Sequence, residues 1–257
     1  LRYLFAAGVG VRVVFFHQHY RNKQNNTYMK TFRNIFLLAG MLFFTFTGWS
    51  QEKEVRKLNS FDAISVTGDI ELVLVKGSEE QAEIFAEGIP ADKLTLRVVR
   101  GELVLKLLNA IFYKGEHLKV VVTYKELREI RALAGASVRS EDTIKSDQLY
   151  LKSGSGANVT VAVKVNSLDV GATEGGVVSV KGSADKQDVA ANTGGNYEGF
   201  ELTCKRAYVR AGTGGVAEVT AEEELDATAN TGGEIIYKGN PGKLQTKTLI
   251  SGTIRKY

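Results

Sequence analysis

The sequence predicts an all-β protein whose second half is a β-solenoid, a stack of similar coils separated by Gly turns. Three observations predict this fold. Apolar and polar residues alternate in the first part of the chain, as they do in strands. The second part repeats itself about every 19 residues. The composition has 27 Gly but only 2 Pro, which favours turns and close backbone packing over a flexible linker. A β-sandwich of short strands is the structural alternative.

Residues 29–50 have the layout of a secretory signal peptide. The basic stretch Met29–Asn34 is followed by an apolar run from Ile35 to Phe46, and small residues precede Gln51. We expect cleavage before Gln51 and export of the mature chain. A membrane anchor is the alternative, but the apolar run is shorter than the about 20 residues that span a bilayer. No Cys stands at the cleavage point, so a lipoprotein anchor is not expected.

Residues 1–28 precede Met29, the position at which a signal peptide should begin, and we expect them to be an upstream segment that lies before the true start of the gene. Residues 1–50 contain six basic residues and no acidic residue. Removing these six from the 33 basic residues leaves 27 against 29 acidic ones, a net charge of −2 for residues 51–257. A nearly neutral mature chain argues against a nucleic-acid partner.

Residues 51–126 are predicted to form an N-terminal β region. Alternating segments, each expected to be a strand, occupy residues 61–75, 94–98, 103–107 and 118–124. Lys76–Ser78 would close the first of them with a turn. Arg100-Gly101 suits a tight hairpin between the second and the third.

Residues 127–257 are predicted to be the solenoid, continuous with residues 51–126 in one domain. Each unit contains a strand, a Gly turn, a second strand and a polar turn. The first inward positions are Ile130, Leu149, Leu168, Gln187, Ala207, Leu225 and Leu244. The second inward positions are Ala132, Leu151, Val170, Val189, Val209, Ala227 and Thr246. The turn positions are Ser137, Gly156, Gly175, Gly194, Gly214, Gly232 and Ser251. An apolar residue then returns at Val159, Val178, Tyr197, Ala217, Ile235 and Ile254.

Pairs of Gly mark four of the turns, at Gly175-Gly176, Gly194-Gly195, Gly214-Gly215 and Gly232-Gly233. Strands stack about 4.8 Å apart, so a corner leaves little room for side chains. Gly also adopts a positive φ without a Cβ penalty. The glycines are therefore predicted to serve the architecture and not a phosphate or metal site.

Three motifs stand out between residues 58 and 257. They are the opening strand Phe61-x-x-Ile64-x-Val66 with its Lys76-Gly77 turn, the Ser153–Gly156 turn that recurs as Thr-Gly-Gly, and Tyr237–Pro241 followed by Ile250–Ile254. Together they resemble a bacterial family of exported auto-transporter adhesins with a head GIN domain. The resemblance implies a right-handed β-helix and an adhesin, and it implies no enzymatic activity. Gly-Gly replaces the Ser-Gly-Ser-Gly-Asp common in that family, so no role is expected for an Asp after the turn.

No catalytic constellation stands out. His117 is the only His beyond residue 28 and is expected at the surface, whereas Cys204, the only Cys, is expected to be a small buried hydrophobe. One Cys and one His cannot form a zinc site. The repeat lacks the Asp of calcium-binding β-rolls, which leaves only incidental calcium at Asp142 or Asp147. We predict no enzyme, no catalytic residue, no cofactor and no metal site.

The leading functional hypothesis is an exported, non-catalytic binding or adhesion module in the periplasm, on the outer membrane or outside the cell, with no membrane span after signal cleavage. Its partners would be surface glycans or envelope components. The candidate binding residues Tyr150, Asp169, Asp188 and Tyr208 each follow a first inward position, so they should share one outward face. One alternative is a polysaccharide lyase or glycoside hydrolase that uses Asp169 and Asp188 with Glu174 near the turn. The other is a periplasmic structural protein without a specific ligand.

Overall fold

The computed structural model describes residues 53–87, 93–108 and 117–257, and every regular element among them is a β-strand. The strands are β1 (Lys53–Lys57), β2 (Ala63–Thr67), β3 (Glu71–Lys76), β4 (Gln81–Glu87), β5 (Leu94–Val99), β6 (Glu102–Leu107), β7 (His117–Tyr124), β8 (Glu129–Leu133), β9 (Ser137–Gly154), β10 (Asn158–Thr173), β11 (Val177–Asn192), β12 (Asn196–Gly212), β13 (Val216–Thr220), β14 (Glu224–Ala229), β15 (Glu234–Lys238), β16 (Lys243–Thr248) and β17 (Thr253–Lys256). In this part of the chain, no helix is long and apolar enough to cross a membrane.

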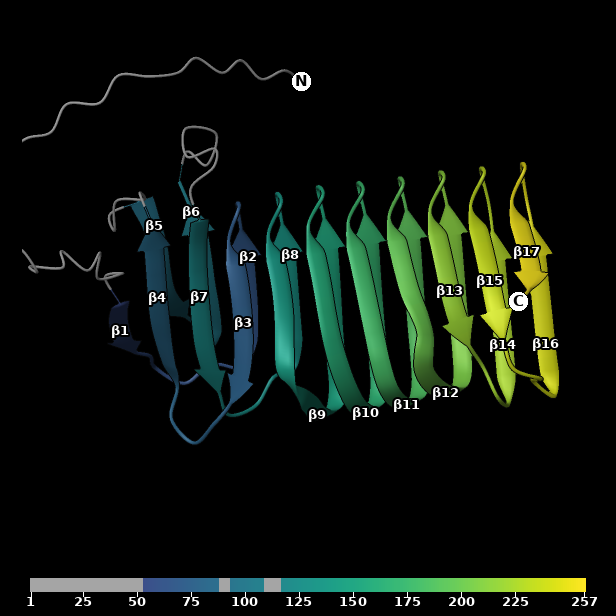
Figure 1. The fold of residues 1–257 in the computed structure, drawn as a ribbon. Helices are drawn as coiled ribbons and strands as arrows, with labels where there is room; N and C mark the ends of the chain where they lie inside the picture. Colours follow the sequence, from purple (N-terminus) through teal and green to yellow (C-terminus); the bar gives the residue numbers. More distant parts are fainter. Residues whose placement is uncertain (1–52, 88–92, 109–116) are drawn as a thin grey trace, which may run out of the picture. The chain divides into compact units, whose positions relative to one another are not determined.

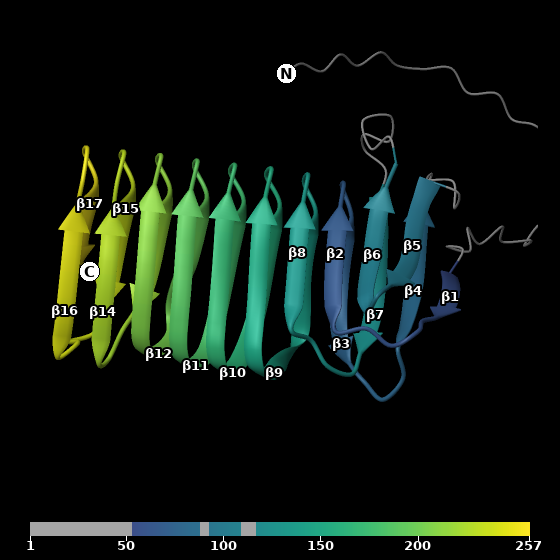
Figure 2. The same ribbon diagram turned by 180° about the vertical axis from the view of Figure 1, so that it is seen from behind.

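Successive coils stack in parallel and form two facing sheets (Figure 1 and, from behind, Figure 2). Sheet A contains β5, β6, β2, β8, the C-terminal halves of β9 to β12, β14 and β16. Sheet B contains β1, β4, β7, β3, the N-terminal halves of β9 to β12, β13, β15 and β17. Strands β9 to β12 run from sheet B around a corner into sheet A, which joins the two sheets. The predicted β-solenoid is confirmed, and the β-sandwich alternative is wrong.

The first predicted strand, residues 61–75, is divided in the structure. Gly68 has a φ of 101° and separates β2 in sheet A from β3 in sheet B. The alternation is genuine on both sides of Gly68, but a glycine in this backbone region reverses the chain. β2 and β3 therefore form a coil that lies on β8 and β9, so the stack includes residues N-terminal to the predicted start of the repeats. The hairpin at Arg100-Gly101 is confirmed, since β5 and β6 pair antiparallel on either side of it.

The alignment of the predicted inward columns is confirmed from Leu149 onward, and they are buried as far as Leu225 and Ala227, whereas Leu244 of the last coil is 48% exposed. Leu149 aligns with Leu168, and each later first position aligns with its counterpart in the next coil. The first unit was assigned wrongly, because Ile130 aligns with Leu151 and its turn is Ala134-Gly135 rather than Ser137. The cause is a bulge in β9, where the pairing with β10 jumps from Arg139 to Thr143 and two extra residues enter that coil.

The two glycines of each pair have different roles. At the turn between β11 and β12, Thr193 and Gly194 have φ values of 50° and 71°, whereas Gly195 has no positive φ. Two successive positive φ values are typical of the tight type I′ hairpin turn. A Cβ on Gly195 would lie 2.2 Å from the carbonyl oxygen of Ala172 in the preceding coil. The first glycine therefore allows the turn, and the second allows two coils to approach closely.

Candidate binding surface

The outward residues of sheet A form aligned columns because successive coils are in register. Tyr150 aligns with Asp169, Asp169 with Asp188, and Asp188 with Tyr208. We call these four residues the outer column. The structure thus brings together all four residues that the sequence proposed, although adjacency alone does not establish that they bind a ligand.

The two carboxylates of the outer column each accept a hydrogen bond from a neighbouring coil. The side-chain amide of Gln148 donates to Asp169 over 3.0 Å, and the guanidinium of Arg210 donates to Asp188 over 3.0 Å. Like charges at directly opposed positions of a sheet repel each other. These two donors offset part of that repulsion and fix the carboxylates in place, while leaving other oxygen lone pairs available.

The two tyrosines flank the carboxylates. Tyr150 is 37% exposed, and the structure gives its hydroxyl no hydrogen-bond partner among the described residues. The next outward column contains Lys152, Gly171, Ala190 and Arg210, and a Cβ on Gly171 would lie 3.7 Å from the Tyr150 hydroxyl. Tyr208 donates a 3.3 Å hydrogen bond to Glu224, and the ammonium of Lys186 lies 5.1 Å from its ring centroid. The Tyr208 ring is therefore held by its neighbours, whereas Tyr150 is the freer end.

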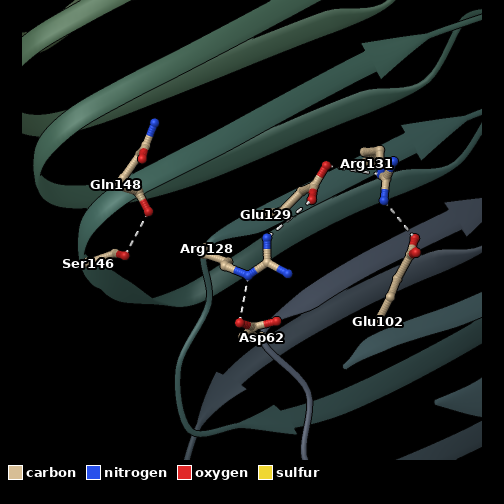
Figure 3. Close-up of polar contacts among 7 residues, drawn as sticks. All are labelled: Asp62, Glu102, Arg128, Glu129, Arg131, Ser146 and Gln148. Carbon is tan, nitrogen blue, oxygen red and sulfur yellow. Dashed lines mark hydrogen bonds and ion pairs between the residues drawn. The ribbon is translucent and has the colours of Figure 1, made fainter. Parts of the chain in front are cut away.

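The same outward column continues toward the N-terminus into a network of ion pairs (Figure 3). Arg131 contacts Glu102 at 2.9 Å and Glu129 at 3.2 Å. Arg128 contacts Asp62 at 2.6 Å, and this hydrogen bond raises the pKa of the Arg128 guanidinium. These contacts join β6, the start of β2 and β8, which are distant in sequence. Their charged groups already pair with one another, so we interpret the network as a structural clasp between these strands.

The remaining chemistry of the described residues is sparse. Cys204 is buried, its thiol contacts the carbonyl oxygen of Arg206 at 3.2 Å, and burial raises its pKa to about 11. The expectation of a buried structural Cys is confirmed. Within residues 53–87, 93–108 and 117–257, no three His, Cys, Asp or Glu side chains gather as metal ligands would. His117 begins β7.

Sequence reasoning missed a groove at the corner where β9 to β12 pass from sheet B to sheet A. It has a volume of about 850 Å³ and extends across the coils from Lys76 to Glu222. The available signal was Lys145 and Lys164, which have the repeat spacing but lie between the predicted strand positions.

The family model described as "Putative auto-transporter adhesin, head GIN domain" matches residues 60–241. The chain belongs to this family. Its fold is shared by a "putative adhesin" of Bacteroides fragilis NCTC 9343, with a TM-score of 0.70 and 21% sequence identity over 80% of this chain and 96% of that one. A "putative lipid binding protein" of Parabacteroides distasonis ATCC 8503 has a TM-score of 0.63 and 20% identity over 80% and 96% of the two chains. Among curated proteins, none matches the chain.

These comparisons confirm the family resemblance that the sequence motifs indicated. At such low identities, the solved structures establish the shared fold and nothing about a ligand. The family and the Bacteroides fragilis protein are named as adhesins, and the Parabacteroides distasonis protein is named as a lipid-binding protein. None of these names describes a catalytic activity.

Proposed function

We propose that this chain is an exported, non-catalytic adhesion module of the cell envelope or cell surface that binds glycans through the outer column. The observation that carries the proposal is the alignment of Tyr150, Asp169, Asp188 and Tyr208 in four consecutive coils. The family and the names of its structural relatives support a binding role. The signal-peptide pattern of residues 29–50 supports export.

The chemistry of the outer column suits sugars. The apolar faces of sugar rings pack against aromatic rings, and sugar hydroxyls donate hydrogen bonds to carboxylates. Tyr150 and Tyr208 supply aromatic rings, and the two Asp side chains supply acceptors held by Gln148 and Arg210. Because these residues are carried by a sheet with backbone hydrogen bonds on both sides, little conformational entropy is lost when a ligand binds.

The enzyme alternative lacks a third carboxylate in reach. Asp169 and Asp188 are neighbours, but Glu174 lies five residues beyond Asp169 in the turn that follows β10, up to about 16 Å away at about 3.3 Å per residue. Glu174 is also engaged at the turn, where it accepts a 2.7 Å hydrogen bond from Ser155. Glycosidase carboxylates are separated by about 5–9.5 Å. Glu174 therefore does not join Asp169 and Asp188, so the three-carboxylate arrangement of the enzyme alternative is not assembled.

A glycan array tests the proposal. The purified chain is compared with a variant that carries Tyr150→Ala, Asp169→Ala, Asp188→Ala and Tyr208→Ala. The matched control replaces Thr160, Ser179, Glu198 and Glu218 by Ala, because these four residues form an equivalent outward column on sheet B. We expect glycan binding by the parent and the control, and its loss in the outer-column variant. Equal binding by all three proteins would contradict the proposal.

Two further measurements test the other parts of the proposal. Mass spectrometry of the protein recovered from cells should find Gln51 as the mature N-terminus, and retention of residues 29–50 would contradict cleavage. Incubation of the chain with each glycan that it binds should release no new reducing end or unsaturated sugar. Turnover that disappears in Asp169→Asn would instead assign an enzyme.

A further inference from the structure

The corner groove contains two cations that the protein itself leaves unpaired. Lys145 of β9 and Lys164 of β10 are directly aligned, so their backbones are about 4.8 Å apart. Neither ammonium forms a hydrogen bond or ion pair with any described residue. Two like charges at directly opposed positions destabilise a sheet. The pair therefore repels in the free protein, and an anionic group placed between the two ammonium groups would relieve that repulsion.

The row two residues farther along each strand, beside the lysine row, presents acceptors and one further cation to the groove. Asp147, Asn166, Asp185 and Lys205 occupy consecutive coils in this row. Asn166 donates to Asp147 over 3.0 Å, and Lys205 pairs with Asp185 at 2.8 Å, which lowers the pKa of the Asp185 carboxyl. The groove is thus a mixture of two free cations with carboxylates and amides, and it also contains acidic residues near its ends, Glu126 and Glu222.

This mixture selects among anionic ligands. An inorganic polyphosphate offers only charged acceptor oxygens, so it brings no hydroxyl donor to offset the repulsion from Asp147, Asp185 and the other acidic residues that line the groove. An acidic polysaccharide instead combines carboxylates with many hydroxyl donors. Its carboxylate fits between Lys145 and Lys164 as a charge-assisted contact, while its hydroxyls match the acceptors of the neighbouring row.

We propose that the corner groove is a second binding site, distinct from the outer column, and that it binds a linear uronic-acid oligosaccharide along the stack. Lys145 and Lys164 hold one carboxylate of the ligand. Ser183 and Thr203 continue the lysine row over the next two coils, so the row becomes neutral where the ligand presents hydroxyls. The groove runs across the coils, as an extended ligand requires.

Isothermal titration calorimetry with tetragalacturonate tests this site. The purified chain is compared with Lys145→Gln/Lys164→Gln and with a control pair, Lys152→Gln/Lys247→Gln. The control removes the same charge from sheet A, where neither lysine forms a hydrogen bond or ion pair with a described residue and both lie outside the groove. We expect the groove variant to bind at least about tenfold more weakly and the control to bind as the parent does. The groove variant should also melt at the same temperature as the parent or higher, because it loses a repulsion.

Cellotetraose and inorganic polyphosphate complete the experiment. Cellotetraose should bind this groove much more weakly than tetragalacturonate because it has no carboxylate. An equal loss of affinity in both lysine pairs, tighter binding of polyphosphate, or no binding of tetragalacturonate by the parent would each overturn the proposal. The outer-column variant should keep its affinity for tetragalacturonate, so failure of the glycan-array proposal and failure of this one are distinguishable.

Discussion

The two ends of the stack fill the space beside the Gly turns in opposite ways. On sheet A, the inward column nearest the turns runs from Leu105 and Val66 through Ala132 and Ser153 to the alanines of the later coils and finally Thr248. On sheet B, the facing position changes from Ile70 through Ala136 and Ala157 to glycine. Both sheets therefore lose side-chain volume in the same direction.

Protein interiors are close-packed, so a narrower side-chain layer requires the two sheets to approach each other. We call the N-terminal part of the stack, where the inward residues Leu105, Val66 and Ile70 are large, the wide end. It is stabilised by burial of these large side chains and by pairing between strands that are distant in sequence, such as β2 with β6 and β8. We call the coils that contain the Gly pairs, from Gly175-Gly176 onward, the repeat end. It is stabilised by backbone contact between neighbouring coils, which only small residues permit. The stability of one continuous stack can therefore depend on apolar burial at one end and, at the other, on the close backbone approach that glycine allows.

The largest effect is expected at the wide end. Leu105→Ala removes a fully buried side chain at the start of the sheet A column whose side chains become smaller along the stack. We call this decrease in side-chain volume the taper. The surrounding strands cannot collapse onto the cavity, because the sheet separation there is set by the neighbouring large residues. We expect a loss of about 2–5 kcal/mol in the free energy of unfolding, measured by urea denaturation. Ala132→Gly, farther along the same column, is the control, and a loss as large as that of Leu105→Ala would contradict the taper.

The repeat end should respond to a methyl group added to the second glycine of a pair. A Cβ on Gly215 would lie 2.2 Å from the carbonyl oxygen of Ala191, whereas a Cβ on Gly214 would have no atom within 4 Å. Gly214 has a φ of 71°, so Gly214→Ala should cost about 1 kcal/mol from backbone strain alone. Gly215→Ala should cost about 3 kcal/mol because a backbone must shift.

Thermal melting of these two adjacent variants separates close approach from conformational freedom. Equal destabilisation would show that the second glycine of each pair is needed only for its flexibility, contrary to the contact with the preceding coil.

Much of this comparison was readable from the sequence, and some of it was not. The inward columns after Leu149 followed from the regular spacing alone, because each coil contacts mainly its neighbours in sequence. The position of β2 between β6 and β8 could not be predicted, since nothing local to residues 63–67 specifies distant partners. The two extra residues in β9 likewise shifted the alignment of Ile130, because a bulge leaves the alternation on either side intact.

The candidate sites divide in the same way. The outer column follows from period two and the repeat length, so its four residues could be grouped before the fold was known. The corner groove was not grouped, although Lys145 and Lys164 have the repeat spacing, because they lie between the strand positions that defined the predicted columns. Gln187 also breaks an otherwise apolar column, and only the structure shows that it accepts a 2.9 Å hydrogen bond from buried Tyr197.

A smaller effect in the repeat region depends on pH. The pKa of Cys204 is raised to about 11 in the folded chain by burial, against about 8.5 for an exposed Cys. Between these values, the unfolded chain loses the thiol proton and the folded chain keeps it, so stability falls as pH rises. The parent should lose about 1.4 kcal/mol per pH unit more than Cys204→Ala does over this window, in urea denaturation at pH 9, 10 and 11. Parallel curves for the two proteins would contradict the raised pKa.

The smallest effect is expected at the clasp that joins the sequence-distant strands of the wide end. The side chains of Arg128 and Asp62 are 57% and 47% exposed, so water screens their 2.6 Å contact. Arg128→Ala should therefore cost only about 0.2–1 kcal/mol at low salt, despite the short distance, and the cost should shrink as salt is added. A double-mutant cycle with Asp62→Ala isolates the pair, because each single change also alters local solvation. A coupling energy well above this range, unchanged by salt, would mean that the wide end depends on its ion pairs as well as on leucine burial. The two ends of the stack would then differ in ion pairing as much as in side-chain volume.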